Sequence, residues 1–424
     1  MARLSRAELQ RLNRSKVLEA ARREFAERGF GRATIDGIAE RAGLTRGAVY
    51  SNFPGKRALY FTVLAELSDA GPDSGEAGRA RTAREALAAF ARAWVARLPL
   101  VTGGLGDPGD PAGEGRPAVD LMPEIVADEH LRAVASGLRR LDALLLGLAL
   151  ERMDVLENAG VPGNAGVTDD SGVPERGGFP ERAGFPERDT GGGDDLRGSQ
   201  AAGGRRVRVA EAVLMTLRGA GELAVAAPGF VEPFDLIAVC EELAGLDLGD
   251  RWTPPLVFPR VQPADAPWPG SARAGGLVPG VMADRGSVRP GDLGAGAVTA
   301  EDGVVAVLGL LEAGAVEEAV RAAPPGVPVT VALVTGDPAE LAPLARLVLA
   351  DVTRCLRRAF PPRAWPRLRL TYDETGALAA AAGVPAVTDE TVAAVRVRDG
   401  RIVARADGPG ACHAIASSVR LASV

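Results

Sequence analysis

The sequence predicts a multidomain protein in which an all-helical N-terminal part precedes a small α/β domain. Over residues 11–248, apolar side chains recur mostly at the spacing of amphipathic helices. Residues 249–297 are rich in proline and glycine, which is typical of a linker. Residues 298–424 contain short β-branched runs that alternate with helical patterns, and this order indicates a sheet with helices packed on it.

Four helical patterns make up the expected N-terminal domain, residues 1–68. The second and third patterns are short and are joined by Ala42-Gly43-Leu44. Each begins with a threonine, Thr34 or Thr45, that can cap the start of a helix. Two short capped helices joined by a tight turn are the pattern of a helix-turn-helix. The four patterns cover residues 11–28, 34–42, 45–53 and 54–68.

The N-terminal domain is basic, whereas the rest of the chain is acidic. Residues 1–60 hold 13 Lys and Arg against 6 Asp and Glu, although the whole chain has a formal net charge of −6. A basic arm on an acidic body is typical of a protein that places one face on a polyanion such as DNA. Cationic faces that bind nothing are also common, so the charge alone does not decide between these interpretations.

The third helical pattern carries the residues expected to read DNA. Eight residues span about 12 Å as a helix, which suits insertion into a major groove about 12 Å wide. With Val49 and Phe53 packed inward, Arg46 can bond guanine or a phosphate, and Tyr50 can contact a thymine methyl group or a phosphate. Gly47 allows close approach to the DNA backbone, while solvated surface is the alternative interpretation for each residue. The candidate DNA-binding residues are Thr34, Thr45, Arg46, Gly47, Tyr50, Ser51, Asn52 and Lys56.

Segments such as Ala33-Thr-Ile-Asp-Gly-Ile-Ala-Glu-Arg-Ala-Gly43 and Asn52-Phe-Pro-Gly-Lys56 closely resemble the N-terminal domain of TetR-family transcriptional regulators. The resemblance implies an all-helical repressor that dimerises through its C-terminal helices and binds a palindromic double-stranded DNA operator. A small-molecule effector, which the sequence does not identify, would release the DNA. The resemblance also implies that the eight candidate residues face DNA. Family members usually carry a histidine or an aromatic residue near positions 51–52, where this chain has Ser51-Asn52, so base specificity stays open.

Residues 79–248 are expected to form the effector-binding and dimerisation bundle. The last two helical patterns are so apolar that they need a partner, which favours a homodimer. Residues 159–205 contain a six-residue repeat whose prolines prevent a helix, and they predict a disordered insert or, alternatively, a short binding motif. The helical patterns cover residues 81–99, 119–158, 207–226 and 233–246.

One face of the helix over residues 81–99 supplies the candidate effector pocket. Phe90, Trp94 and Leu98 lie on this face at helical spacing. Ordinary core packing is the alternative interpretation for each of these side chains.

The C-terminal domain, residues 298–424, is similar to the second half of thioredoxin- and peroxiredoxin-like domains. The similarity rests on residues 372–384 and on two apolar runs across Asp399-Gly400, which is a hairpin signal. It implies a catalytic cysteine just after the first strand, but residues 309–314 contain none. The domain is therefore interpreted as a non-catalytic appendage that binds a ligand or a partner. Its strands are expected at 304–308, 327–334, 368–371, 392–397 and 402–406, and its helices at 312–323, 339–360, 375–382 and 409–421.

Two other functions stay open on the sequence alone. The first is a thiol-redox or peroxidase-type enzyme with a regulatory N-terminus, which would depend on Cys355 or Cys412 as its nucleophile. The second is a scaffold or co-regulator in which the C-terminal domain and the repeat recruit a protein. The first is disfavoured because the expected active-site cysteine is missing, so no enzymatic activity is predicted.

Composition sets further expectations about location and cofactors. The three cysteines are too far apart for a disulfide framework, and His130 and His413 are too few for a metal cluster, so no metal or cofactor is expected. The N-terminus lacks the apolar core of a signal peptide, and the longest apolar run, residues 144–150, is far shorter than the roughly 20 residues of a membrane span. A cytoplasmic protein without a membrane partner is predicted.

Overall fold

The computed structural model describes residues 5–70, 78–98, 116–160, 206–249, 252–257, 259–268, 275–277 and 302–421. Beyond Gly160, the predicted insert at 159–205 lies outside the described residues, as does most of the loop predicted after residue 99.

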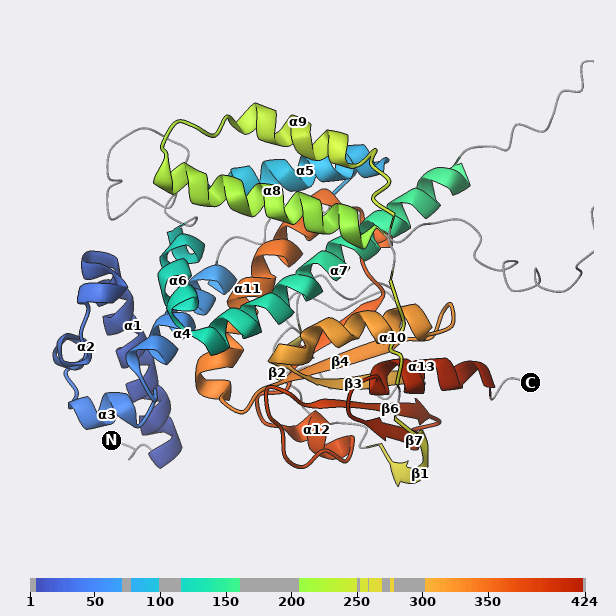
Figure 1. The fold of residues 1–424 in the computed structure, drawn as a ribbon. Coiled ribbons are helices and arrows are strands. Elements are labelled where there is room, and N and C mark those ends of the chain that lie inside the picture. Colours follow the sequence, from blue (N-terminus) through green and yellow to red (C-terminus); the bar gives the residue numbers. More distant parts are fainter. Residues whose placement is uncertain are drawn as a thin grey trace, which may run out of the picture.

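The N-terminal domain contains the four helices expected from the sequence (Figure 1). A capping box starts the first helix, because the Ser5 side chain accepts from the Glu8 backbone N–H while Glu8 accepts from the Ser5 N–H. The short second and third helices both begin at the predicted threonine caps. The bounds are α1 Arg6–Arg32, α2 Ile35–Ala42, α3 Arg46–Tyr50 and α4 Lys56–Ala70.

The middle of the chain is helical, as predicted. The long pattern predicted over residues 119–158 is divided at Asp128 into two helices, and Asp128 accepts a hydrogen bond from the Leu131 N–H at 3.1 Å. Among the described residues, no helix combines the length and apolar character needed to cross a membrane. The bounds are α5 Ala83–Val95, α6 Arg116–Ala127, α7 Glu129–Gly160, α8 Val207–Ala226 and α9 Pro233–Leu243.

The C-terminal part forms a mixed sheet covered by helices. Over the described residues the strand order is β1-β7-β6-β3-β4-β5-β2, with β3, β4 and β5 parallel and the other pairings antiparallel. Asp399 and Gly400 both adopt positive φ in the β6–β7 turn, which confirms the predicted hairpin. The strands are β1 Gln262–Pro267, β2 Gly275–Leu277, β3 Gly303–Gly309, β4 Val329–Val334, β5 Leu368–Tyr372, β6 Val392–Arg398 and β7 Arg401–Asp407, and the helices are α10 Val316–Ala322, α11 Pro338–Ala359, α12 Ala377–Ala381 and α13 Ala411–Leu421.

The predicted linker over 249–297 contains two strands that the sequence analysis did not expect. β1 pairs with β7 at one edge of the sheet, and β2 pairs with β5 at the other edge. Trp268, which follows β1, is 4% exposed and packs in the core on one face of the sheet. Proline and glycine content hid these strands because edge strands tolerate both residues.

The two faces of the sheet contribute to different cores. Alternate residues such as Val305 and Val307 of β3 pack with Trp268 and α12. Their neighbours Val304 and Ala306 belong to a core that continues without interruption into the N-terminal helices. This core therefore contains residues from both sides of the domain boundary predicted at residue 298.

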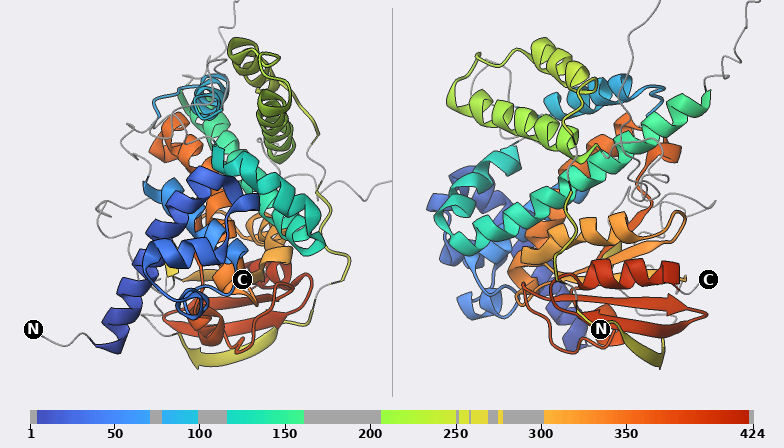
Figure 2. Two further views of the ribbon diagram at one scale, coloured as in Figure 1. Left: turned by 90° about the vertical axis from the view of Figure 1, so that its left-hand side faces the viewer. Right: turned by 45° about the vertical axis from the view of Figure 1, so that its right-hand side comes forward.

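Two helices join the N-terminal helices to the sheet. Figure 2 shows α7 crossing the molecule between the α8–α9 pair and the sheet. α11 follows β4 in the chain, yet it packs against α4, α5 and α7. Gly137 of α7 touches the turn after β3 so closely that a Cβ atom there would lie 2.4 Å from the Leu310 carbonyl oxygen. Only glycine permits this approach of α7 to the C-terminal part.

The substitution Gly137→Ala is expected to destabilise the protein by roughly 1–3 kcal/mol, the usual cost of overpacking. Urea denaturation followed by circular dichroism measures this loss. Gly219→Ala in α8 is the matched control, because nothing lies within 4 Å of its added Cβ atom. The control should be neutral or stabilising by up to about 1 kcal/mol. Equal stabilities for the two variants would show that α7 does not depend on this approach.

Candidate nucleic-acid interface

The predicted helix-turn-helix packs on α1 through its inward residues. Ile38 of α2, Val49 of α3 and Phe53 are at most 2% exposed. Gly43 ends α2 with a φ of 63°, a left-handed conformation that favours glycine in this turn. Because the inward side chains fix both helices, the opposite face of α3 is presented to solvent.

Both predicted cap threonines adopt the expected geometry. The Thr34 hydroxyl accepts from the Gly37 N–H at 3.1 Å, and the Thr45 hydroxyl accepts from the Ala48 N–H at 3.2 Å. Both residues are exposed. The starts of α2 and α3 therefore lie at the surface, where helix N-termini favour anions such as phosphate.

Four predicted DNA-facing residues gather on the outer side of α3. Arg46, Gly47, Tyr50 and Ser51 are exposed, and Tyr50 retains 43% of its accessible surface. The Arg46 guanidinium lies 5.5 Å from the centre of the Tyr50 ring and 3.5 Å from Asp36. Exposed ion pairs of this kind contribute roughly 0–1 kcal/mol, so the guanidinium can turn toward DNA at little cost.

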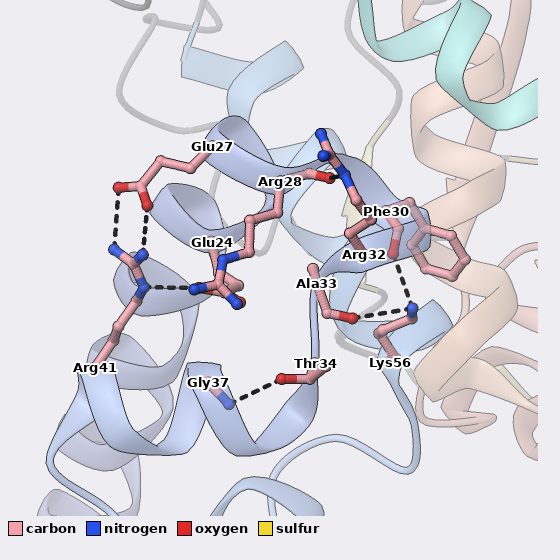
Figure 3. Close-up of polar contacts among 10 residues, drawn as sticks. All are labelled: Glu24, Glu27, Arg28, Phe30, Arg32, Ala33, Thr34, Gly37, Arg41 and Lys56. Atoms are coloured by element: carbon pink, nitrogen blue, oxygen red, sulfur yellow. Dashed lines mark hydrogen bonds and ion pairs between the residues drawn. The ribbon is translucent and has the colours of Figure 1, made fainter.

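Two further candidates have structural partners within the domain. Asn52 is half-buried and donates to the Ala48 carbonyl oxygen at 2.8 Å. The Lys56 ammonium donates to the carbonyl oxygens of Phe30 at 2.8 Å and Ala33 at 3.1 Å (Figure 3). Lys56 therefore ties the start of α4 to the end of α1 and has one N–H donor left. The sequence did not reveal this contact, because it joins segments far apart in the chain.

A carboxylate–arginine network that the sequence analysis missed holds α2 on α1 (Figure 3). Glu24 is fully buried and accepts from Arg41 Nε at 2.7 Å, while Arg28 lies 3.3 Å from its other oxygen. Arg41 also donates one hydrogen bond to each carboxylate oxygen of Glu27, and these bonds lower the pKa of the Glu27 carboxyl group. One feature of the sequence did indicate that Glu24 is buried, because Glu24 follows Val17, Ala20 and Ala21 on the apolar face of α1.

The candidate effector residues lie in the helical part. Phe90 and Trp94 are buried, and their rings stack with centroids 6.2 Å apart. Leu98 is half-buried against α8, since a Cβ atom on Gly221 would lie 3.3 Å from it. These contacts are those of packed core residues.

All three cysteines are buried. Burial raises the pKa of Cys240 to about 12 and that of Cys355 to about 11, and it also shifts the pKa of Cys412 upward. These thiols are protonated at neutral pH, whereas a redox nucleophile must be a thiolate. The described residues also contain no group of three potential metal ligands.

Two short capped helices, a glycine turn and an exposed face with arginine and tyrosine define a helix-turn-helix domain of the DNA-binding class. Residues 17–63 match the family model described as bacterial regulatory proteins, tetR family. The N-terminal domain is therefore a TetR-family helix-turn-helix, which confirms the resemblance seen in the sequence.

The similar proteins are transcriptional regulators. The HTH-type transcriptional regulator TtgR of Pseudomonas putida is 42% identical over 69 residues, which are 16% of this chain and 32% of that protein. The HTH-type transcriptional repressor AcnR of Corynebacterium diphtheriae is 38% identical over 55 residues, which are 13% and 29% of the two chains. The matched part thus spans about a third of the length of these curated relatives.

One solved structure, a TetR transcriptional regulator from Rhodococcus sp. RHA1, aligns with 56% of this chain and 95% of its own. Its sequence identity of 15% and TM-score of 0.26 are too low to support an argument about the fold.

Substituting Arg41→Ala is expected to destabilise the domain by roughly 1–3 kcal/mol, because it leaves a buried carboxylate short of a partner. Urea denaturation monitored by circular dichroism tests this expectation. Arg23→Ala is the matched control, since Arg23 pairs with Glu19 on α1 and both side chains are more than half exposed. If both variants unfold at the same urea concentration as the wild type, the network does not hold α2 in place.

Proposed function

We propose that this protein is a ligand-responsive transcriptional repressor that binds a palindromic DNA operator as a homodimer. The observation that carries the proposal is the exposed outer face of α3, with Arg46 and Tyr50 side by side on a capped helix-turn-helix. The regulators and repressors among the similar proteins support it. We place its action in the cytoplasm, where it meets DNA.

In the proposed complex, α3 enters the major groove. Arg46 bonds a guanine edge or a phosphate, and Tyr50 contacts a thymine methyl group or a phosphate. Gly47 lets the helix approach closely, while Ser51 and Asn52 reach bases or phosphates. Thr34, Thr45 and the remaining donor of Lys56 bind the flanking phosphates.

The proposed dimer forms through α8 and α9, which contact each other. Large apolar side chains remain exposed on these helices and the turn between them, which is unusual for a surface without a partner. A twofold axis there presents two copies of α3 to half-sites about 34–36 Å apart, or a multiple of that distance. The exposed residues are Met215, Leu223, Val225, Phe230, Phe234 and Val239.

We propose that the effector binds in the helical part, beside Phe90, Trp94 and Leu98. The C-terminal part is proposed to be a non-catalytic accessory that binds a ligand or a partner, and its thioredoxin-like identity stays a prediction. The high pKa values of its buried thiols give no support to the redox alternative.

Arg46→Ala is expected to weaken operator binding by about 1–3 kcal/mol. Where the arginine contacts a phosphate, the slope of the logarithm of the binding constant against the logarithm of the salt concentration should also fall in magnitude by about one. Gel shifts with DNA from upstream of the native gene, at several salt concentrations, measure both quantities. Arg23→Ala on α1 is the control, because it removes the same charge from an exposed ion pair. Absence of any shift with the native upstream DNA, or full binding by a Tyr50→Ala/Lys56→Ala variant, would contradict the proposed interface.

Phe234→Asp is expected to weaken dimerisation roughly 30-fold or more, as loss of a buried aromatic anchor does. Sedimentation equilibrium at micromolar concentrations follows the change. Leu256→Asp serves as the control because Leu256 is 93% exposed and lies outside α8 and α9. A wild-type protein that is monomeric throughout this range would rule out the α8–α9 dimer.

A further inference from the structure

The start of α1 carries cationic side chains that the domain does not use for its own packing. From Arg6 to Lys16 no residue of this helix is buried, and burial begins at Val17. We call residues 6–16 the α1 extension, and Figure 2 (left) shows it projecting from the rest of the molecule. It holds four Lys and Arg residues against one carboxylate, that of Glu8.

Most cations of the α1 extension lack the carboxylate partners that arginines have elsewhere in the domain. Further along α1, for comparison, Arg23 pairs with Glu19 at 2.9 Å. Among the residues that the structure describes, Arg6, Arg11 and Lys16 form no ion pair. Exposed cations without internal partners attract a polyanion, and their charge is not offset within the protein.

The recognition helix α3 brings little positive charge of its own to DNA. Arg46 is the one cation in its sequence, and Asp36 lies 3.5 Å from it. The Lys56 ammonium already donates to the carbonyl oxygens of Phe30 and Ala33. Because much of the affinity of a protein for DNA comes from neutralised phosphates, contacts by a further cationic element would strengthen binding.

Arg14 fixes the α1 extension relative to α3. Its Nη1 donates to the carbonyl oxygen of Asn52, which follows α3, at 3.2 Å. Its guanidinium also lies 4.3 Å from the centre of the Phe53 ring. Gln10 and Arg6 precede Arg14 by four and eight residues, so they continue along the same side of the helix.

The length of the α1 extension matches the spacing of the DNA backbones. At about 1.5 Å per residue, Arg6 lies roughly 12 Å along the helix axis from Arg14. This distance is close to the width of a major groove, about 12 Å. At about 100° per residue, Arg6, Arg11 and Arg14 lie within one half of the helix circumference, whereas Lys16 lies on the other half.

The α1 extension is helical without burial against the rest of the domain. The capping box of Ser5 and Glu8 closes its first turn, and its sequence is rich in strong helix formers such as Ala, Leu, Gln and Arg. A preformed helix loses little conformational entropy when it binds. The one carboxylate of the segment is held in the cap, so it does not pair with Arg6 or Arg11.

We propose that the α1 extension is a second DNA-binding element, in which Arg6 and Arg11 bind phosphates beside the major-groove segment that α3 reads. This contact rests on the proposed repressor function and adds a sequence-independent component to it. Phosphate contacts position a protein on the duplex without reading bases, so base recognition stays with α3. Arg14 is a positioning residue, because it holds the extension against the end of α3.

The first test measures the affinity of the full-length protein for DNA from upstream of the native gene by fluorescence anisotropy. Arg6→Ala/Arg11→Ala removes two phosphate contacts, so between about 50 and 200 mM salt the wild type should lose roughly tenfold more affinity than this variant. A duplex of scrambled sequence should show the same difference. Arg22→Ala/Arg23→Ala, further along α1, is the matched control and should keep the wild-type salt dependence. Circular dichroism confirms that each variant is folded.

The second test locates the α1 extension on the duplex with a tethered cleavage reagent. All three native thiols are buried, so Gln10→Cys supplies one exposed thiol for an iron–EDTA label. The label should cleave DNA beside the segment that α3 protects. Ala26→Cys is the matched control, because Ala26 is also exposed on α1 but lies beyond the extension, and its label should not cleave there.

Three results would overturn the inference: unchanged salt dependence in Arg6→Ala/Arg11→Ala, no cleavage from the label at position 10, or equal cleavage from positions 10 and 26. If the wild type binds DNA, each of these results refutes the α1 contact alone. If the wild type binds neither the native nor the scrambled duplex, the repressor proposal is refuted and the α1 contact with it.

Discussion

The packing of α4 against α11 is the contact on which the rest of the structure depends. From Ala58 to Ala65, every residue of α4 is buried, because α1 covers one side of the helix and α11 covers the other. A helix that is apolar around its circumference needs partners on all sides. The helix-turn-helix thus receives part of its support from a helix that the chain supplies only after β4.

Polar contacts fix the alignment of this helix pair. Arg57 reaches both Asp128, at 2.8 Å, and Glu340 at the start of α11, and Arg354 reaches Ser68 near the end of α4. A buried ion pair adds little net stability, but breaking one is costly, so such pairs act mainly against wrong alignments. The apolar packing accordingly supplies most of the attraction, while the arginines select a single register. The position of α3 is thereby coupled to the C-terminal part.

The sequence predicted those features that depend on neighbours in the chain. The threonine caps, the Gly43 turn and the Asp399-Gly400 hairpin each arise from local backbone preferences, and helical spacing identified Arg46 and Tyr50 as outward residues. Contacts between distant segments were not predictable in this way. The edge strands β1 and β2, the Glu24–Arg41 network and the carbonyl partners of Lys56 all join residues whose proximity no local pattern encodes.

The support that α11 gives to α4 also sets the order in which the protein can be completed. About 270 residues separate the two helices in the chain, so at about 5–20 residues per second the ribosome makes α11 roughly 15–55 s after α4. During that interval the apolar side of α4 has no native cover. The helix-turn-helix domain is synthesised before the helix that completes its packing, so a nascent chain that ends before α11 carries the family motif without the helix that holds it in place.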